Sequence, residues 1–389
     1  MKLIDFDCVP LENEKIVIYG TTIGGKVIFQ CLQNNELKVD FFCDRSKKYS
    51  EFCGIPVKDP TVLLNNKHYK VLIALTRSFD SAYQFLEKIG YNEAYCCKNL
   101  IKEKKIEDFS YAENEKELVQ DFLEKYPIYA APNAEKDIIL PSLEVFITER
   151  CTLRCRDCSH LIPRYQHPRD YDMNQIINTL ENTLKVVTKI PDLIILGGEP
   201  ILHKELYKLL YWGNEQKAIG TLTIISNGSV LPDEKVLTSI KETNTRIRLS
   251  NYGKYSVKIN DFAKILKKRE ISYYINDELW TDMGEIVCHS YSKEELKEIF
   301  TDCPFSYDYL LLKGRIFRCA HVAHLNNLGV IDSYMHDSVE LLEIKVENIE
   351  DKKKELRKYM QIDYLEGCMY CNGVKNSIQG IEPAIQGVR

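Results

Sequence analysis

Short apolar segments alternate with amphipathic segments along most of this 389-residue chain, and this alternation limits the folds open to it. Between residues 15 and 99, the segments KIVIYG, VDFFCD and KVLIAL are typical of buried strands, and helix-favouring residues follow the first and third of them. A second, longer series begins at Leu143. Strands that alternate with helices form parallel sheets covered by helices. The sequence therefore predicts an α/β protein, and its length suggests two or three domains.

The second series predicts five strands and four helices, with a weaker sixth strand at residues 285–288. The five strands are expected at 143–148, 193–196, 222–226, 246–250 and 271–275, and the helices near 173–188, 204–212, 233–243 and 259–268. The strongly charged residues 102–125 favour a helix, and a polar, proline-containing stretch follows at 127–141. We expect this region to connect the two series.

Charge and hydropathy exclude several classes of partner. A net charge of −5 gives no general attraction to nucleic acid or to an anionic membrane. No apolar run approaches the roughly 20 residues that a membrane span needs. The first ten residues contain two aspartates where a signal peptide would have a basic start and an apolar stretch. The sequence therefore predicts a cytoplasmic protein that has neither nucleic acid nor membrane as a partner.

Fourteen cysteines are many for a reducing compartment, where clustered thiols more often bind metal than form disulfides. Half of them lack the spacing of metal ligands and are expected to be small buried side chains: Cys8, Cys31, Cys43, Cys53, Cys96, Cys97 and Cys288. The other half form short clusters: Cys151, Cys155, Cys158, Cys303, Cys319, Cys368 and Cys371. The clustered half requires a chemical explanation.

The first cluster is a C-x3-C-x2-C loop that directly follows the first strand of the second series. Cys151, Cys155 and Cys158 can hold three irons of a four-iron cluster, which leaves the fourth iron open to chelate a small molecule. A zinc loop is the alternative, and it would need a fourth ligand, for which His160 is a candidate.

This loop resembles the signature of the radical S-adenosylmethionine superfamily. The resemblance implies a partial (β/α)6 barrel with a 4Fe–4S cluster whose open iron binds S-adenosylmethionine. It also implies reductive cleavage to a 5′-deoxyadenosyl radical that abstracts a hydrogen atom, with a flavodoxin- or ferredoxin-type protein as reductant. One residue departs from the pattern, because Asp157 stands where the family usually has an aromatic side chain next to the adenine.

Polar or glycine-rich motifs end the later strands, where barrel active sites lie. Gly197 and Gly198 allow close approach of the backbone to a ligand and would present free N–H groups, and Glu199 adds a carboxylate. This motif resembles the family loop that binds the ammonium group of the cofactor. Ser226 and Asn227 end the next strand and could bind a ribose. Arg246, Arg248 and Ser250 share one face of the following strand, which either points into the barrel toward a ligand or faces solvent.

The second cluster consists of Cys303, Cys319 and the pair Cys368 and Cys371. Four thiolates suffice for a complete four-iron cluster or for one zinc ion. The C-x10-G-x4-C spacing between the first two and the later C-x2-C resemble the twitch domain, a shortened SPASM domain, which implies an auxiliary 4Fe–4S cluster. Cys288 could return a hydrogen atom to a substrate radical, or it could be a buried structural thiol.

The glycine-rich turn of the first series approximates a dinucleotide-binding fingerprint. Gly20 and Gly24 lie between a strand and a helix, and Asp44 ends the next strand, but Thr22 replaces the second glycine. The region resembles the small Rossmann-like domains found beside sugar-modifying enzymes. It could bind a nucleotide or nucleotide sugar, or it could be a degenerate unit that docks a partner.

These resemblances imply five parts: a Rossmann-like domain (1–100), a helical connector (101–141), a radical S-adenosylmethionine partial barrel (142–300), a twitch domain (301–375) and a tail (376–389). The function they imply is an oxidoreductase that dehydrogenates a hydroxyl-bearing carbon of a small, sugar-like substrate. Radical epimerisation of a sugar and modification of a peptide or protein side chain are alternatives. A nucleotide-binding sensor stabilised by metal, without turnover, is an alternative of another class.

Overall fold

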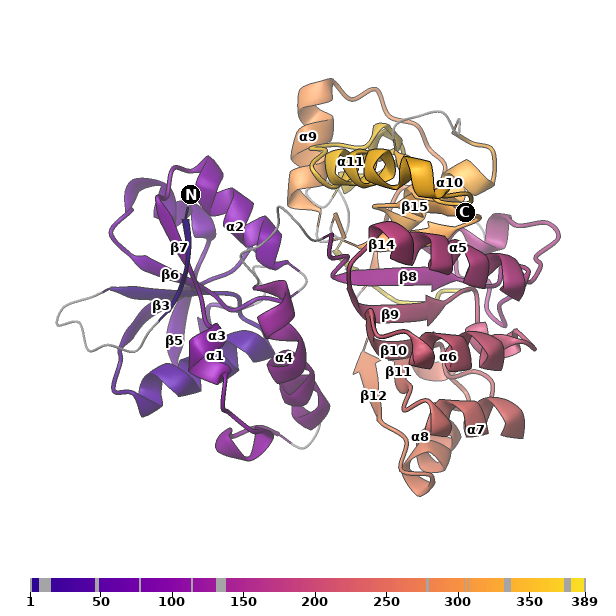
Figure 1. Cartoon of the computed structure of the whole chain (residues 1–389), viewed down its shortest axis with the longest axis horizontal. Coiled ribbons are helices and arrows are strands. Elements are labelled where there is room, and N and C mark those ends of the chain that lie inside the picture. Colours follow the sequence, from indigo (N-terminus) through magenta and orange to yellow (C-terminus); the bar gives the residue numbers. More distant parts are fainter. Residues whose placement is uncertain are drawn as a thin grey trace. The chain divides into compact units, whose positions relative to one another are not determined.

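The computed structural model of the chain divides into two compact units, Met1–Glu135 and Lys136–Arg389, which are described separately (Figure 1). The residues described are 2–6, 15–45, 49–76, 78–112, 115–130, 138–277, 280–303, 305–306, 308–331, 337–373 and 379–387. Both units contain a largely parallel sheet covered by helices, which confirms the α/β fold class.

The first unit is a seven-stranded sheet in the order β1-β7-β6-β2-β3-β5-β4. Its central strands β2 and β6 are almost entirely apolar and buried, because helices cover both faces. The three expected strands are confirmed as β2, β3 and β6, whereas β1 and β7 were not predicted from the sequence. The strands are β1 (Lys2–Asp5), β2 (Ile16–Tyr19), β3 (Val39–Cys43), β4 (Glu51–Phe52), β5 (Ile55–Lys58), β6 (Lys70–Ile73) and β7 (Glu93–Cys96). The helices are α1 (Ile23–Asn34), α2 (Phe79–Lys88), α3 (Lys98–Ile101) and α4 (Lys116–Tyr129).

Helix α4 belongs to the first unit. Its residues Val119, Phe122 and Tyr126 are buried in the same apolar core as β2 and β6. The segment expected as a separate connector at 101–141 therefore supplies part of this core, and the division between the units falls after residue 135.

The second unit is an eight-stranded sheet in the order β12-β11-β10-β9-β8-β14-β15-β16. Strands β8 to β12 are parallel and confirm the five barrel strands expected from the sequence. They are β8 (Ser142–Phe146), β9 (Ile190–Leu196), β10 (Ile219–Ser226), β11 (Arg246–Asn251) and β12 (Tyr273–Asp277). The helices between them are α5 (Met173–Val186), α6 (Leu206–Glu215), α7 (Glu234–Glu242) and α8 (Ile259–Lys268).

The expected sixth strand at residues 285–288 is wrong. Gly284 and Glu285 have φ angles of 92° and 51°, and this left-handed backbone interrupts an extended segment. The sixth parallel strand is instead β14 (Tyr309–Leu312), which pairs with β8 on the side opposite β9. It continues into the antiparallel strands β15 (Arg315–Phe317) and β16 (Ser338–Glu340).

The two faces of this sheet pack against different partners. Outward residues such as Val145 and Ile195 join the core formed with the covering helices. Inward residues such as Phe146 and Leu196 join a separate core that includes Ala323 of α10 (Ala320–Asn327). Helix α10 therefore covers the inner face near β8 and β14.

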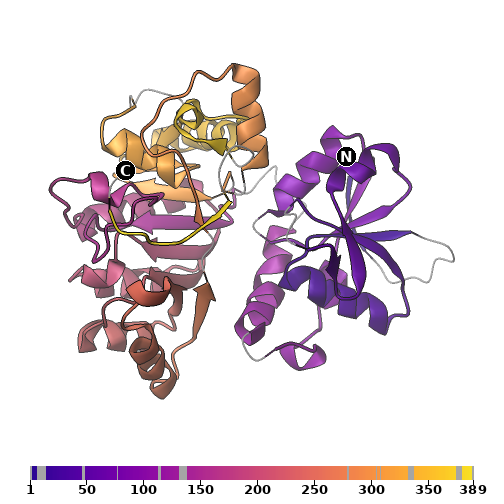
Figure 2. The same ribbon diagram turned by 180° about the vertical axis from the view of Figure 1, so that it is seen from behind.

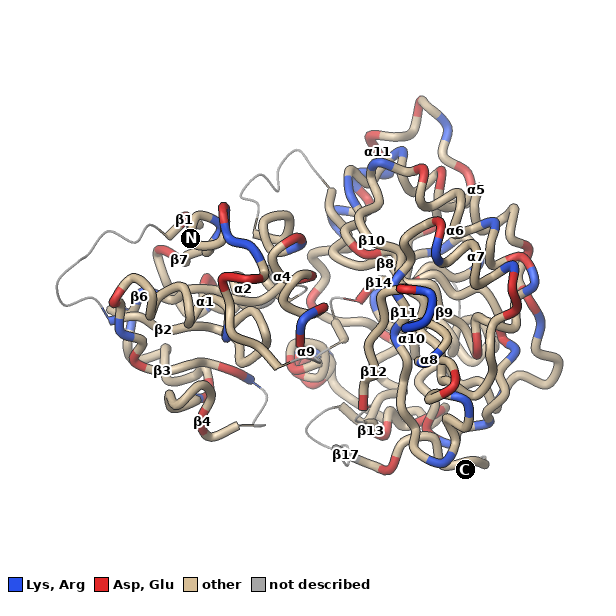
Figure 3. Tube along the Cα trace, turned by 90° about the horizontal axis from the view of Figure 1, so that it is seen from below, with Lys and Arg blue, Asp and Glu red and all other residues tan. Residues whose placement is uncertain are grey.

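The remaining elements surround the second cysteine cluster or lie near the first. Helix α9 (Lys293–Asp302) precedes β14, and α11 (Ile349–Met360) packs near β16. Short strands β13 (Trp280–Thr281) and β17 (Gln379–Ile381) form an antiparallel pair. Figure 3 shows acidic and basic residues interspersed along each unit. Among the residues that the structure describes, no helix has the length and apolar character to cross a bilayer.

Candidate functional site: two clusters of cysteines

The structure brings the three cysteines of the first loop together at the carboxyl end of β8. Burial raises the pKa of the Cys151 thiol to about 12, and the nearby Glu199, Cys158 and Cys155 contribute to the increase. Burial likewise raises the pKa of Cys155 to about 12, with Cys158 adding to it. Neighbouring thiols with raised pKa values stay protonated at neutral pH. They become thiolates when a bound metal compensates their negative charge.

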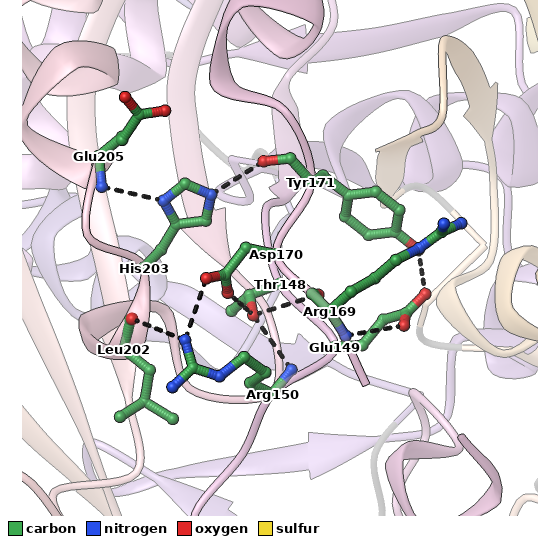
Figure 4. Close-up of polar contacts among 9 residues, drawn as sticks. All are labelled: Thr148, Glu149, Arg150, Arg169, Asp170, Tyr171, Leu202, His203 and Glu205. Carbon is green, nitrogen blue, oxygen red and sulfur yellow. Dashed lines mark hydrogen bonds and ion pairs between the residues drawn. The ribbon is translucent and has the colours of Figure 1, made fainter. Parts of the chain in front are cut away.

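Hydrogen bonds fix the backbone that leads from β8 into the loop (Figure 4). The Thr148 hydroxyl donates to Asp170 Oδ1 at 2.6 Å, and the Arg150 N–H donates to Thr148 Oγ1 at 3.0 Å. Arg150 Nη1 also pairs with Asp170 Oδ2 at 3.0 Å. Asp170 therefore positions residues 148–150, the segment that leads into Cys151. The sequence analysis did not identify Asp170.

A second set of contacts holds Glu149 in the same segment, residues 148–150. The buried Glu149 accepts from the Tyr171 hydroxyl at 2.6 Å and from the Arg169 N–H at 3.1 Å. His203 accepts from the Glu205 N–H at its Nδ1, so its Nε2 donates to the Tyr171 carbonyl at 2.9 Å (Figure 4). These residues lie on three separate segments, and no motif in the sequence connects them.

The glycines after β9 pack against the cysteine loop. The Gly198 N–H donates to the Thr148 carbonyl at 2.7 Å, and the Glu199 N–H donates to the Arg150 carbonyl at 2.8 Å. A Cβ atom on Gly198 would lie 2.4 Å from that Arg150 carbonyl oxygen, and one on Gly197 would lie 2.7 Å from the Thr148 oxygen. The expectation that the two glycines present free N–H groups is wrong at Gly198, because the cysteine loop accepts its N–H.

Glu199 is fully buried, and its carboxylate links the loops that follow β9 and β10. Its Oε1 accepts from the Ile201 N–H at 3.2 Å, and its Oε2 accepts from the Asn227 N–H at 2.9 Å. Burial raises the pKa of this carboxyl to about 7, although the two amide hydrogen bonds oppose the increase. The carboxylate therefore shapes the loops after β9 and β10 beside Cys151.

The other expected cofactor residues also lie at this edge. Asn227 Nδ2 approaches Cys151 Sγ at 3.6 Å and donates to Thr152 Oγ1 at 3.2 Å. Ser226 is buried and accepts from the Gly228 N–H at 3.2 Å. Ile247 and Leu249 belong to the outer core, so Arg248 and the buried Ser250 lie on the inner face of β11.

The residues of this loop fit an iron–sulfur cluster. Three neighbouring thiols are available, the Leu153 N–H donates to Cys151 Sγ at 3.4 Å, and Gln386 Nε2 donates to Cys155 Sγ at 3.5 Å. Hydrogen bonds of this kind are what cluster sulfurs receive from proteins. Among the described residues, no group of three or more His, Cys, Asp or Glu side chains is arranged to hold a single metal ion.

The second cysteine cluster also comes together. Cys303 follows α9, Cys319 precedes α10, and Cys368 and Cys371 lie in and directly after a 3-10 turn, Glu366–Tyr370. Burial raises the pKa of Cys368, and the charges of Cys319, Cys371 and Cys303 raise it further. The four thiols therefore lie near one another, with Cys368 buried and the other three partly buried, and they come from segments far apart in the sequence.

Arg318 and Asp337 hold the loops around these four thiols, and neither was identified from the sequence. The buried Arg318 guanidinium donates to the carbonyls of Ser306, Met360 and Ile362 at 2.7–3.1 Å. The Asp337 carboxylate accepts from two N–H groups of the turn that contains Cys368, at 2.8 and 2.6 Å.

A buried polar network connects the two regions. The Tyr165 hydroxyl lies 2.7 Å from His324 Nδ1, and Asn327 Nδ2 donates to the hydroxyls of Tyr165 and Tyr171 at 2.7 and 2.9 Å. His324 and Asn327 are on α10, directly after Cys319, whereas Tyr171 contacts Glu149 beside the first loop. Residues 148–150, which lead into Cys151, are therefore linked through side chains to α10, the helix that follows Cys319.

The unclustered cysteines behave in two ways. Cys31, Cys43, Cys96 and Cys97 are buried as expected, and Cys8 lies outside the described residues. Cys53 and Cys288 are exposed, so burial was the wrong expectation for them. Burial and a hydrogen bond with Cys288 raise the pKa of Tyr370, which places Cys288 beside the turn that contains Cys368.

The candidate nucleotide residues of the first unit have partners within the unit. Asp44 Oδ2 accepts from the Thr21 N–H at 2.7 Å and from its hydroxyl at 2.6 Å. A Cβ atom on Gly24 would lie 2.3 Å from Phe122 and 2.4 Å from the Ala74 carbonyl oxygen, and Gly20 has a φ angle of 122°. Backbone geometry and packing thus account for both glycines.

Comparison with known proteins gives a partial sequence match and several structural matches at low identity. No protein-family model matches the chain. Its sequence is similar to the GTP 3′,8-cyclase of Clostridium acetobutylicum, with 27% identity over 136 residues, which is 34% of this chain and 41% of the cyclase. The chain thus spans about two fifths of the length of this curated relative.

Three solved structures are similar at low identity. BtrN in complex with AdoMet and 2-DOIA gives a TM-score of 0.41 and 18% identity, over 61% of this chain and 95% of BtrN. The anSMEcpe protein with bound AdoMet and a peptide gives a TM-score of 0.37 and 12% identity, over 59% and 87%. Streptococcus suis SuiB bound to S-adenosylmethionine gives 0.33 and 13%, over 75% and 83%.

Proposed function

We propose that this chain is a radical S-adenosylmethionine enzyme, an oxidoreductase that acts on a small hydroxyl-bearing, sugar-like substrate. The observation that carries the proposal is the loop of three adjacent thiols at the carboxyl end of β8, one buried and two partly buried, braced by the Gly197–Glu199 segment. Cys151, Cys155 and Cys158 would hold a 4Fe–4S cluster with one open iron. Such a cluster supplies reductive cleavage of S-adenosylmethionine and hence a 5′-deoxyadenosyl radical.

The chain's own residues would bind the cofactor and the substrate. Glu199 keeps the loops after β9 and β10 in place, and Asn227 and Ser226 lie where a ribose could bind. Arg248 and Ser250 offer polar groups on the inner face of β11, which suits a substrate with hydroxyl or carboxylate groups. A flavodoxin- or ferredoxin-type protein is the proposed reductant, and a nucleotide or nucleotide sugar is the proposed ligand of the first unit.

The four-thiol site favours dehydrogenation over epimerisation. Cys303, Cys319, Cys368 and Cys371 would close all four irons of an auxiliary cluster, which could accept an electron but would not easily coordinate an alkoxide. A substrate radical on a hydroxyl-bearing carbon that loses one electron and the hydroxyl proton becomes a carbonyl. Epimerisation would need a hydrogen donor instead, and Cys288 beside Tyr370 is the candidate donor.

Iron analysis tests the cluster assignment. After anaerobic reconstitution we expect about eight irons per chain, from two four-iron clusters. The triple variant Cys151→Ala, Cys155→Ala, Cys158→Ala should keep about four irons and lose cleavage of S-adenosylmethionine to 5′-deoxyadenosine. Full iron content in that variant would contradict the first site, and zinc in place of iron would favour the non-catalytic sensor.

Turnover in deuterated water tests the reaction. Dehydrogenation predicts a product two mass units lighter than the substrate, with one S-adenosylmethionine consumed per product. The Cys288→Ala variant should give the same product. A product one mass unit heavier than the substrate, abolished by Cys288→Ala, would establish epimerisation instead.

A further inference from the structure

Residues 379–387, here called the strap, follow the last cysteine of the second cluster and end on the loop of the first. Figure 2 shows the strap as a yellow extended segment. Its end pairs with the cysteine loop as a short antiparallel bridge between Cys155 and Gln386. The Arg156 N–H donates to the Ile385 carbonyl at 2.7 Å, and the Gly387 N–H donates to the Arg154 carbonyl at 2.8 Å.

The Gln386 side chain has one orientation that satisfies all of its neighbours. Its Oε1 accepts from the Arg154 N–H at 2.7 Å, and its Nε2 donates to the Ala384 carbonyl at 2.6 Å. The same nitrogen donates to Cys155 Sγ at 3.5 Å. A flipped carboxamide would place its oxygen against the Ala384 carbonyl and its NH2 group against the Arg154 N–H, so the donor must face the sulfur.

Packing also holds the strap against the loop. Ala384 is fully buried in a small apolar cluster with Leu153 and Cys155. At its other end, β17 pairs with β13, whose Trp280 packs edge-on against Tyr252. The strap is therefore anchored at both ends, although Gln386 itself is exposed to solvent.

We infer that the strap is part of the first metal site, and that Gln386 is a positioning residue that orients Cys155 and donates a hydrogen bond to its thiolate. This inference rests on the proposed function, since it requires an iron–sulfur cluster on Cys155. Reduction adds an electron to the cluster, and part of the added charge resides on its sulfurs. A donor to a cysteine sulfur stabilises the reduced state more than the oxidised state, so it raises the reduction potential.

The test is a redox titration of the reconstituted full chain, followed by electron paramagnetic resonance. The signal of the first cluster is the one that changes when S-adenosylmethionine is added. Gln386→Glu keeps an acceptor for the Arg154 N–H but replaces the donor with a negative charge, so its first cluster should titrate at a more negative potential. Gln386→Met removes the donor without adding charge and should shift the potential in the same direction by less. Glu382→Gln, an exposed position on the same strap, is the matched control and should leave the potential unchanged.

Iron content provides a second measurement. A chain that stops after residue 381 should lose about half of its iron, because only the first loop loses its paired strand. Loss of first-site iron in Gln386→Glu, with auxiliary iron retained, would also support the inference. Wild-type potential and wild-type iron content in both Gln386 variants would overturn it. A wild-type chain that holds no iron would instead refute the proposed function.

Discussion

Glu199 shows how much one buried side chain determines at this site. Its two oxygens each accept a backbone N–H, from Ile201 and from Asn227. The Glu199→Gln variant offers one acceptor and turns an NH2 group toward the other amide. An unsatisfied buried group costs about 1–3 kcal/mol. We expect a lower melting temperature and weaker binding of S-adenosylmethionine in a titration, with iron content unchanged.

Glu215→Gln, at an exposed position on α6, is the control for this change and should alter neither quantity. Unchanged cofactor affinity in Glu199→Gln would remove Glu199 from the cofactor site. Loss of iron would show that the carboxylate also shapes the cysteine loop, which its neighbour Gly198 contacts directly.

Arg318 has the corresponding role at the second cluster. Arg318→Met would leave the carbonyls of Ser306, Met360 and Ile362 without their donor next to Cys319. We expect total iron to fall from about eight to about four per chain, while the signal that responds to S-adenosylmethionine persists. Arg315→Met removes an ion pair with Glu340 and a hydrogen bond to the Ser338 hydroxyl, neither of which holds a cysteine-bearing loop, and should keep all the iron. Equal losses in the two variants would contradict this specific role.

At the scale of elements, the packing of α4 accounts for Gly24, a residue whose place after β2 suggests a nucleotide site. Phe122 of α4 packs against Gly24, and the Tyr126 hydroxyl donates to the Ile73 carbonyl and accepts from the Cys97 N–H at 2.9 Å. Tyr126→Phe would leave both backbone groups unsatisfied inside the core, at a cost of about 1–3 kcal/mol. We expect the first unit to melt earlier in calorimetry, with iron content unchanged. A fall in iron would show that the units do not fold independently.

Local sequence patterns predicted the helices and strands better than they predicted which of them pair or pack together. The residues of β8 to β12 and of α5 to α8 carry clear apolar periodicity, and the structure confirms them. The segment YLLL of β14 is equally apolar, but nothing within it specifies β8 as its partner, because that pairing joins positions far apart in the chain. For the same reason, the cysteine spacings identified the two clusters, whereas Asp170, Arg318 and Gln386 act through contacts that no spacing records.

At the scale of the whole molecule, the boundary between the units gives a direct test by truncation. A chain lacking residues 1–135 should remain soluble and keep about eight irons, because neither cysteine cluster lies in the first unit. A chain lacking only residues 1–100 would retain α4 without its core, with Val119, Phe122 and Tyr126 exposed to water. We expect this chain to aggregate, as measured by light scattering. Equal solubility of the two truncations would contradict the assignment of α4 to the first unit.

The pairing of β14 with β8 has a consequence for how the protein is made. Strand β8 ends at residue 146 and its partner begins at residue 309, so a ribosome must add about 160 residues before that edge can close. At typical rates of synthesis this takes roughly 10–30 s, during which β8 presents an open edge to the cell. The strap emerges later still. Iron delivered before the strap has emerged would therefore meet a half-formed loop, so we expect productive loading only after residue 387 has been synthesised.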